Sequence, residues 1–160
     1  MVYRYKATIA GNKIFLREYE VRGNTSLYSF HLFLQNDLGF APDQIVMFRG
    51  LDKNNKIKAE YGLFDMGDGT MDSISLEKTI SSGQSKLLYV YDTFKDRAIT
   101  LELLSREEEL SRRSYPRLIA EKGKNPDQFS DNYDDFEQMI ELNDSDPLFQ
   151  VDELPEGEEG

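Results

Sequence analysis

The chain has 160 residues, of which 39% are hydrophobic and 12% aromatic, and this is enough apolar material for one domain with its own core. It has no cysteine and one histidine, which excludes disulfides, cysteine nucleophiles and a zinc site built from nitrogen and sulfur ligands. We expect no metal and no cofactor. The first ten residues lack a long apolar run, so we expect neither a signal peptide nor a membrane span, and a cytoplasmic protein.

The net charge of -11 is distributed unevenly along the chain. Thirteen of the 30 acidic residues follow Lys124, and no lysine or arginine follows it. The other 17 acids nearly balance the 19 basic residues. We therefore expect residues 1–124 to be near neutral. We also expect one domain over residues 1–143, followed by an acidic, mobile tail at residues 144–160.

The first half of the chain shows both strand and helix periods. Val2–Ile9 alternates apolar and polar residues, which predicts a half-buried strand, and Ile14–Val21 is predicted to pair back to it after a Gly-Asn turn. Apolar residues at helical spacing predict a helix over Ser26–Leu38, which Gly39 ends. Two further strands and a short helix are predicted at Gln44–Arg49, Lys56–Tyr61 and Ser75–Ile80.

The densest polar cluster beside an apolar stretch lies in Lys86–Leu104. The two halves of this segment predict two strands, and the turn Tyr91–Arg97 between them holds two carboxylates, a lysine, an arginine and two aromatic residues. After it, Ser105–Glu108 has the capping-box pattern of a short helix. Leu118–Lys122 is predicted to add an edge strand, and residues 132–142 a last helix docked on the body.

Together these elements predict one α+β domain over residues 1–143. We expect a mostly antiparallel sheet of five to six strands packed against one main helix, with short extra helices and the acidic C-terminal tail.

The turn supports two interpretations, which the sequence leaves open. If Asp92 and Asp96 are buried together, their pKa values could differ, so that one works as an acid and the other as a base. Arg17 or Arg97 would then hold an anion. Alternatively, Asp92 accepts hydrogen bonds from turn amides, and Asp96 pairs with Lys95 or Arg97. No serine–histidine arrangement or nucleophile elbow indicates hydrolysis.

The missing catalytic combinations favour a non-enzymatic binding module. Its contact residues for a protein or peptide partner would be Tyr91, Phe94, His31 and Tyr115, although a lone helical histidine is also typical of a hydrogen-bonded structural residue. A third hypothesis is that the acidic tail mimics nucleic acid or masks a basic patch. Because of the tail's charge, we do not expect direct nucleic-acid binding. We expect a monomer or weak dimer.

The glycine- and aspartate-rich loop Asp65–Gly69 invites a calcium hypothesis. Its spacing does not fit the EF-hand loop, which needs acids at alternate positions and a glutamate at position twelve. A solvated turn is the better interpretation.

The order of the segments resembles the plasmid pRiA4b ORF-3-like family, small bacterial and archaeal proteins of unknown function. The resemblance is carried by the tyrosine-rich first strand, by Phe15–Arg17 in the second and by Ser29–His31 in the helix. The family hallmark is a strand ending in Tyr-Asp-Phe-Gly-Asp-x-Trp. It is similar to Tyr91–Arg97, where Lys95 replaces the glycine and Arg97 the tryptophan.

The end of the chain resembles the same family. Tyr115-Pro116 and Asn125–Asp127 are similar to its closing proline-rich segment, and Tyr133–Ile140 to its terminal helix. The resemblance implies an α+β domain and, for some members, a link to mobile elements. Gln44–Phe48 lacks the histidines that the family places there, so no metal or acid–base role is carried over to this stretch.

Overall fold

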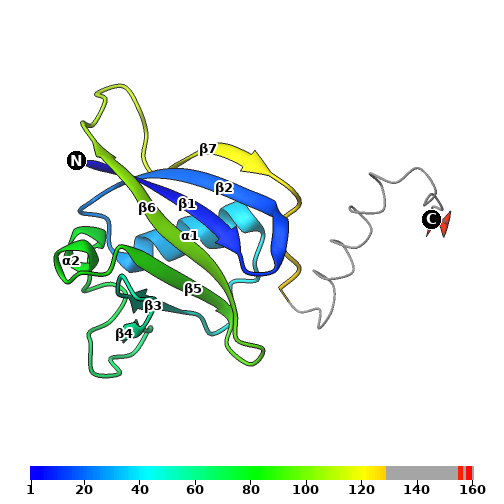
Figure 1. Cartoon of the computed structure of the whole chain (residues 1–160), viewed down its shortest axis with the longest axis horizontal. Coiled ribbons are helices and arrows are strands. Elements are labelled where there is room, and N and C mark those ends of the chain that lie inside the picture. Colours follow the sequence, from blue (N-terminus) through cyan, green and yellow to red (C-terminus); the bar gives the residue numbers. More distant parts are fainter. Residues whose placement is uncertain (129–154, 157, 160) are drawn as a thin grey trace. The chain divides into compact units, whose positions relative to one another are not determined.

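The computed structural model describes residues 1–128, 155–156 and 158–159 (Figure 1). Residues Met1–Gln128 form the unit that holds the main sheet. Its elements are β1 (Val2–Ile9), β2 (Asn12–Arg22), α1 (Leu27–Leu38), β3 (Met47–Leu51), β4 (Ile57–Tyr61), α2 (Leu76–Ser81), β5 (Lys86–Asp92), β6 (Arg97–Glu107) and β7 (Arg117–Lys122). Two two-residue strands, β8 (Pro155–Glu156) and β9 (Glu158–Glu159), pair separately. The predicted helix at 132–142 and most of the predicted tail lie outside the described residues.

The seven strands β1 to β7 form one antiparallel sheet in the order β4-β3-β5-β6-β1-β2-β7. The predicted fold class, an α+β domain of five to six strands packed against one main helix, is therefore wrong. The described residues form a mostly antiparallel seven-stranded sheet with two short helices.

The segment after the central hairpin explains part of this error. The capping-box pattern at Ser105–Glu108 predicted a helix, but β6 continues to Glu107 and pairs with β1, with Ser105 opposite Arg4 and Glu107 opposite Val2. The Ser105 hydroxyl donates to Glu107 Oε2 at 2.9 Å, so it caps no helix. A capping box is a local signal, and the pairing with a distant strand outweighs it.

The predicted helix at Ser26–Leu38 is confirmed as α1, which lies behind the strands in Figure 1. The Ser26 hydroxyl accepts a hydrogen bond from the Ser29 amide, and Gly39 ends the helix in the left-handed conformation with φ 72°. The buried residues of α1 enter the core, and they are Leu27, Phe30, His31, Leu34 and Leu38. Neither described helix is long and apolar enough to cross a membrane.

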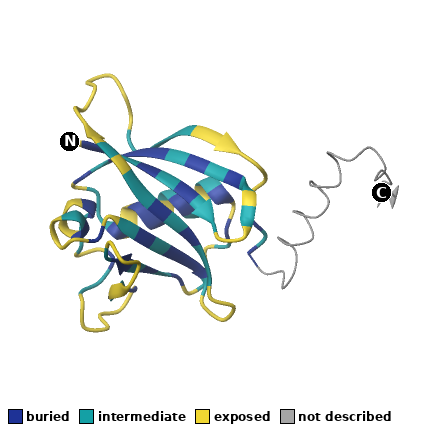
Figure 2. Ribbon diagram, in the orientation of Figure 1, coloured by how far each residue is buried: buried dark blue, intermediate teal, exposed yellow. Residues whose placement is uncertain are grey.

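The core between α1 and the sheet is rich in aromatic rings. Side chains alternate between the two faces of each strand, and the resulting banding is visible in Figure 2. Phe30 of α1 stacks on Phe48 of β3 with ring centroids 6.2 Å apart, and Tyr89 of β5 lies 5.0 Å from Phe48. The first contact joins the helix to β3, and the second extends the same aromatic cluster to β5.

The predicted hairpin at Lys86–Leu104 is confirmed. Its strands, β5 and β6, are the third and fourth in the sheet and pair antiparallel from Lys86 opposite Glu102 to Asp92 opposite Arg97. Asp96 adopts φ 55°, a left-handed conformation that aspartate tolerates in turns. The hairpin therefore lies in the middle of the sheet, with its turn at one end.

A buried arginine joins β2 to the end of β7. The Arg17 side chain is 2% exposed and donates to the carbonyl oxygens of Leu16 (2.8 Å), Lys122 (2.7 Å) and Gly123 (2.9 Å) and to Asn125 Oδ1 (2.8 Å). These hydrogen bonds from the guanidinium hold the segment after β7 against the sheet.

Replacing this arginine tests how much the contact contributes. Arg17→Met leaves buried oxygens without a donor, and an unpaired buried group costs about 1–3 kcal/mol, so we expect the free energy of unfolding to fall by about 3 kcal/mol. Urea denaturation followed by circular dichroism measures it. The control is the exposed Arg106→Met, for which we expect a change below about 0.5 kcal/mol. Equal losses in the two variants would contradict this account of Arg17.

Candidate functional site

The turn at Tyr91–Arg97 is held by its own carboxylates. Asp92 Oδ1 accepts from the amides of Phe94 and Lys95, both at 3.1 Å. Asp96 Oδ1 accepts from Arg49 Nη1 at 2.8 Å, and this bond connects the turn to β3. The first carboxylate therefore fixes the backbone of the turn, and the second ties it to a neighbouring strand.

The segment that ends the described unit lies against the same hairpin. Arg97 Nη1 donates to the carbonyl oxygen of Asp127 at 3.3 Å. The Gln128 side chain is buried, donates to the Tyr91 carbonyl oxygen at 3.1 Å and accepts from the Ala41 amide at 2.7 Å. Residues 127–128 therefore brace the end of the hairpin.

Two of the predicted binding residues have buried side chains. Tyr91 is 1% exposed and stacks on Phe40 with ring centroids 4.5 Å apart. His31 is buried beside Tyr89, whose hydroxyl oxygen lies 2.7 Å from His31 Nδ1. Burial lowers the pKa of His31 and raises that of Tyr89, so at neutral pH the imidazole is uncharged. The side chains of Tyr91 and His31 are therefore buried and are not exposed for contact with a partner.

The other predicted residues lie in different places. Phe94 is at the tip of the turn and is 94% exposed. Tyr115 lies near the opposite end of β6, where Arg22 approaches its ring at 5.4 Å and the Leu110 amide donates to its hydroxyl at 3.3 Å. Arg17 is engaged in the contacts to β7 described above. The structure thus brings Asp96 to Arg49 and Arg97 to Asp127, and it places Tyr115 and Arg17 elsewhere.

The acid–base hypothesis for Asp92 and Asp96 needs both groups in one hollow. Asp92 accepts turn amides, and Asp96 has 69% of its side chain exposed. Neither of the two hollows described below is lined by these residues. In the described part of the chain, no three His, Asp or Glu side chains are placed to hold a metal ion. The acid–base role stays a prediction.

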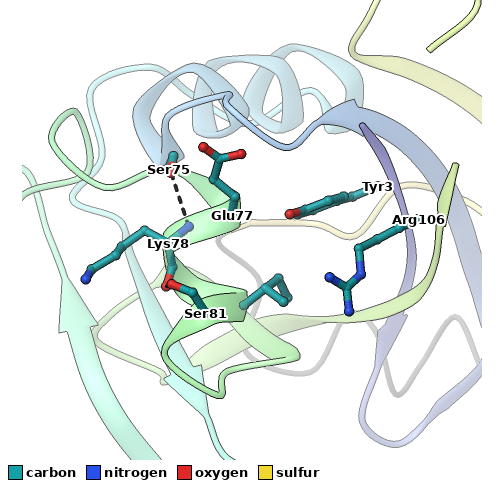
Figure 3. Close-up of a pocket in the computed structure, with 7 residues that line it drawn as sticks. Tyr3, Ser75, Glu77, Lys78, Ser81 and Arg106 are labelled. Atoms are coloured by element: carbon teal, nitrogen blue, oxygen red, sulfur yellow. Dashed lines mark hydrogen bonds between the residues drawn. The ribbon is translucent and has the colours of Figure 1, made fainter. Parts of the chain in front are cut away.

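The larger hollow, of about 560 Å³, lies between α2 and the strands β1 and β6 (Figure 3). Its volume is in the range of small-molecule sites. Figure 3 shows Tyr3 and Arg106 extending toward α2, which contributes Glu77 and Ser81 to the lining of the hollow. Because a carboxylate and a guanidinium share this open hollow, it suits a polar ligand, but it contains no paired nucleophile and base.

No site was predicted from the sequence at the smaller hollow. It has a volume of about 150 Å³ and is lined by Tyr28 of α1 together with Leu63, Met71 and Asp72 of the loop after β4. From the sequence, the Asp65–Gly69 part of this loop is interpreted only as a solvated turn. Three large apolar residues within four positions, Leu63, Phe64 and Met66, were the signal that could have identified it.

The described residues thus define a small antiparallel-sheet protein whose candidate sites are surface turns and shallow hollows. The family described as plasmid pRiA4b ORF-3-like protein matches residues 2–153, and the chain belongs to that family. The resemblance seen in the sequence is confirmed. The function of the family is unknown.

A solved structure has a similar fold. The crystal structure of a protein of unknown function from Methanosarcina mazei Go1 matches with a TM-score of 0.72 and 18% sequence identity, covering 89% of this chain and 81% of the other. At this identity the likeness shows the fold alone. No curated protein matches the chain.

Burial of His31 predicts a pH dependence of stability. The unfolded chain takes up a proton on this residue near pH 6.5, whereas the folded chain disfavours it. The free energy of unfolding that His31 contributes is therefore present above that pH and lost as the pH falls. In urea denaturation between pH 7.5 and 5.5, we expect wild type to lose more stability than His31→Gln, which does not titrate. Parallel pH profiles would contradict the prediction.

Proposed function

We propose that the protein is a non-enzymatic binding module that presents the Tyr91–Arg97 turn to a protein or peptide partner. The observation that carries the proposal is Phe94, whose side chain is 94% exposed at the tip of the turn. An aromatic ring in water costs free energy in the unbound protein, and aromatic residues are enriched among the side chains that dominate binding interfaces.

The backbone under Phe94 supports this proposal. Asp92 accepts the Phe94 and Lys95 amides, and the Arg49–Asp96 ion pair ties the turn to β3. A ring held on a braced turn loses little conformational entropy on binding, and such preorganisation increases affinity.

A second exposed apolar residue lies at the same end of the sheet. β3 and β5 pair antiparallel with Met47 opposite Val90, so the chain just before β3 runs toward the turn. Ile45, in that stretch, is 69% exposed. Phe94 and Ile45 would provide the apolar centre of an interface, and the charges of Asp96 and Arg49 its polar rim.

The proposal is tested by photocrosslinking of the full-length protein in its native cells. Benzoylphenylalanine at position 94 is expected to give a discrete adduct with a second protein, whereas the same group at the exposed control position Leu110 is not. Phe94→Ser should then weaken the affinity for that protein at least about tenfold, as expected for loss of a central aromatic contact, measured by calorimetry.

Three outcomes would contradict the proposal. Adducts that are equally diffuse at positions 94 and 110 would show that the turn is ordinary surface. An adduct between two copies of the chain would assign the turn to self-association. An unchanged affinity of Phe94→Ser would mean that the ring does not contribute to binding.

A further inference from the structure

A second exposed apolar surface lies on the loop between β4 and α2, residues 62–75. Phe64 is 83% exposed, and Leu63 and Met66 beside it are also exposed. Single exposed apolar residues are common, but three within four positions of one loop are a grouped patch of the kind found at interaction sites.

This loop is internally ordered. Asp65 Oδ1 accepts from the amides of Gly67 (2.7 Å) and Gly69 (3.1 Å), and both glycines have the positive φ values, 117° and 103°, that favour glycine. The Met71 amide donates to the Gly62 carbonyl oxygen at 2.9 Å and closes the loop at its base. The apolar residues are therefore carried on a closed, hydrogen-bonded loop.

The loop is also fixed to the beginning of α1. The amides of Leu27 and Tyr28 donate to the carbonyl oxygens of Ile74 (2.8 Å) and Met71 (2.9 Å). These bonds satisfy two of the free amides at the start of the helix and hold the loop beside its first turn. The exposed side of α1 thereby continues the surface of the loop.

A small hollow lies where the two segments meet. It is lined by Tyr28, Leu63, Met71 and Asp72 and has a volume of about 150 Å³. A cavity of roughly this size holds one benzene molecule, so it has room for a single aromatic or branched side chain. Leu32, one helical turn after Tyr28, is also exposed and extends the apolar surface.

The surroundings of this hollow are acidic. The loop itself, residues 62–75, contains three acids and no lysine or arginine, and residues 23–48, which include α1, contain two acids and no lysine or arginine. Asp65, Asp68 and Asp72 are exposed on the loop itself. Backbone amide hydrogen bonds lower the pKa of Asp65, so it is charged at neutral pH.

We propose that Tyr28, Leu32, Leu63, Phe64 and Met66, here called the acidic apolar patch, bind a short peptide segment of a partner protein. One apolar side chain of the peptide enters the hollow, and lysine or arginine residues next to it face Asp65, Asp68 and Asp72. Charge complementarity selects this partner, because a nucleic acid or an anionic lipid surface carries the same sign of charge as the loop.

A display experiment tests the proposal with full-length protein. Random twelve-residue peptides on phage are selected on the wild type and counter-selected on Leu63→Ser/Phe64→Ser, a variant whose changes lie at exposed positions. We expect the enriched peptides to contain an apolar residue within two positions of lysine or arginine. As synthetic labelled peptides, they should bind the variant at least about tenfold more weakly by fluorescence anisotropy.

Further measurements separate the proposal from a general loss of structure or charge. The exposed control Ile57→Ser should retain wild-type affinity, and circular dichroism should show all variants folded. Affinity for the wild type should fall with increasing salt and in Asp72→Asn. Enrichment of peptides that bind the double variant equally well, or that lack any excess of lysine and arginine, would overturn the proposal, as would a failure to enrich any peptide.

Discussion

The pairing of β6 with β1 is the contact on which the rest of the structure depends. β1, β2 and β7 form one run of adjacent strands, and β4, β3, β5 and β6 form the other. They become one sheet only through the ladder from Val2 opposite Glu107 to Thr8 opposite Thr100. This ladder joins residues about a hundred positions apart, and its loop-closure entropy is offset by the aromatic core that the joined sheet forms with α1.

The proposed binding surfaces share a physical design. In each, exposed apolar side chains are carried by a short segment whose backbone is fixed by aspartate. Asp92 accepts amides under Phe94, and Asp65 accepts amides beside Phe64 and Met66. A carboxylate used in this way is engaged with the backbone of its own turn. Rigid presentation lowers the entropy lost on binding.

The candidate site was predictable only where a residue's role is local. The interpretation of Asp92 as an acceptor of turn amides needs only the next three residues, and the structure has this contact. Arg17 and His31 have partners, Lys122 and Tyr89, that are distant in sequence. A polar residue in a strand or helix can face either solvent or the core. A buried charge or imidazole needs a hydrogen-bond partner, and sequence periodicity alone does not identify that partner.

The sequence by itself determined the elements with strong local signals. The alternation of Val2–Ile9, the capped and glycine-ended helix of α1 and the two halves of the 86–104 hairpin all have short-range physical causes, and each is present. Tertiary structure decided what depends on distant partners. β6 continues through a capping box because β1 is there to pair with it. The sequence predicts an edge strand at Leu118–Lys122, but only the tertiary structure shows that β2 is its partner. The hollow between Tyr28 and Leu63 forms where two segments far apart in the chain meet. Local sequence patterns cannot predict such a contact.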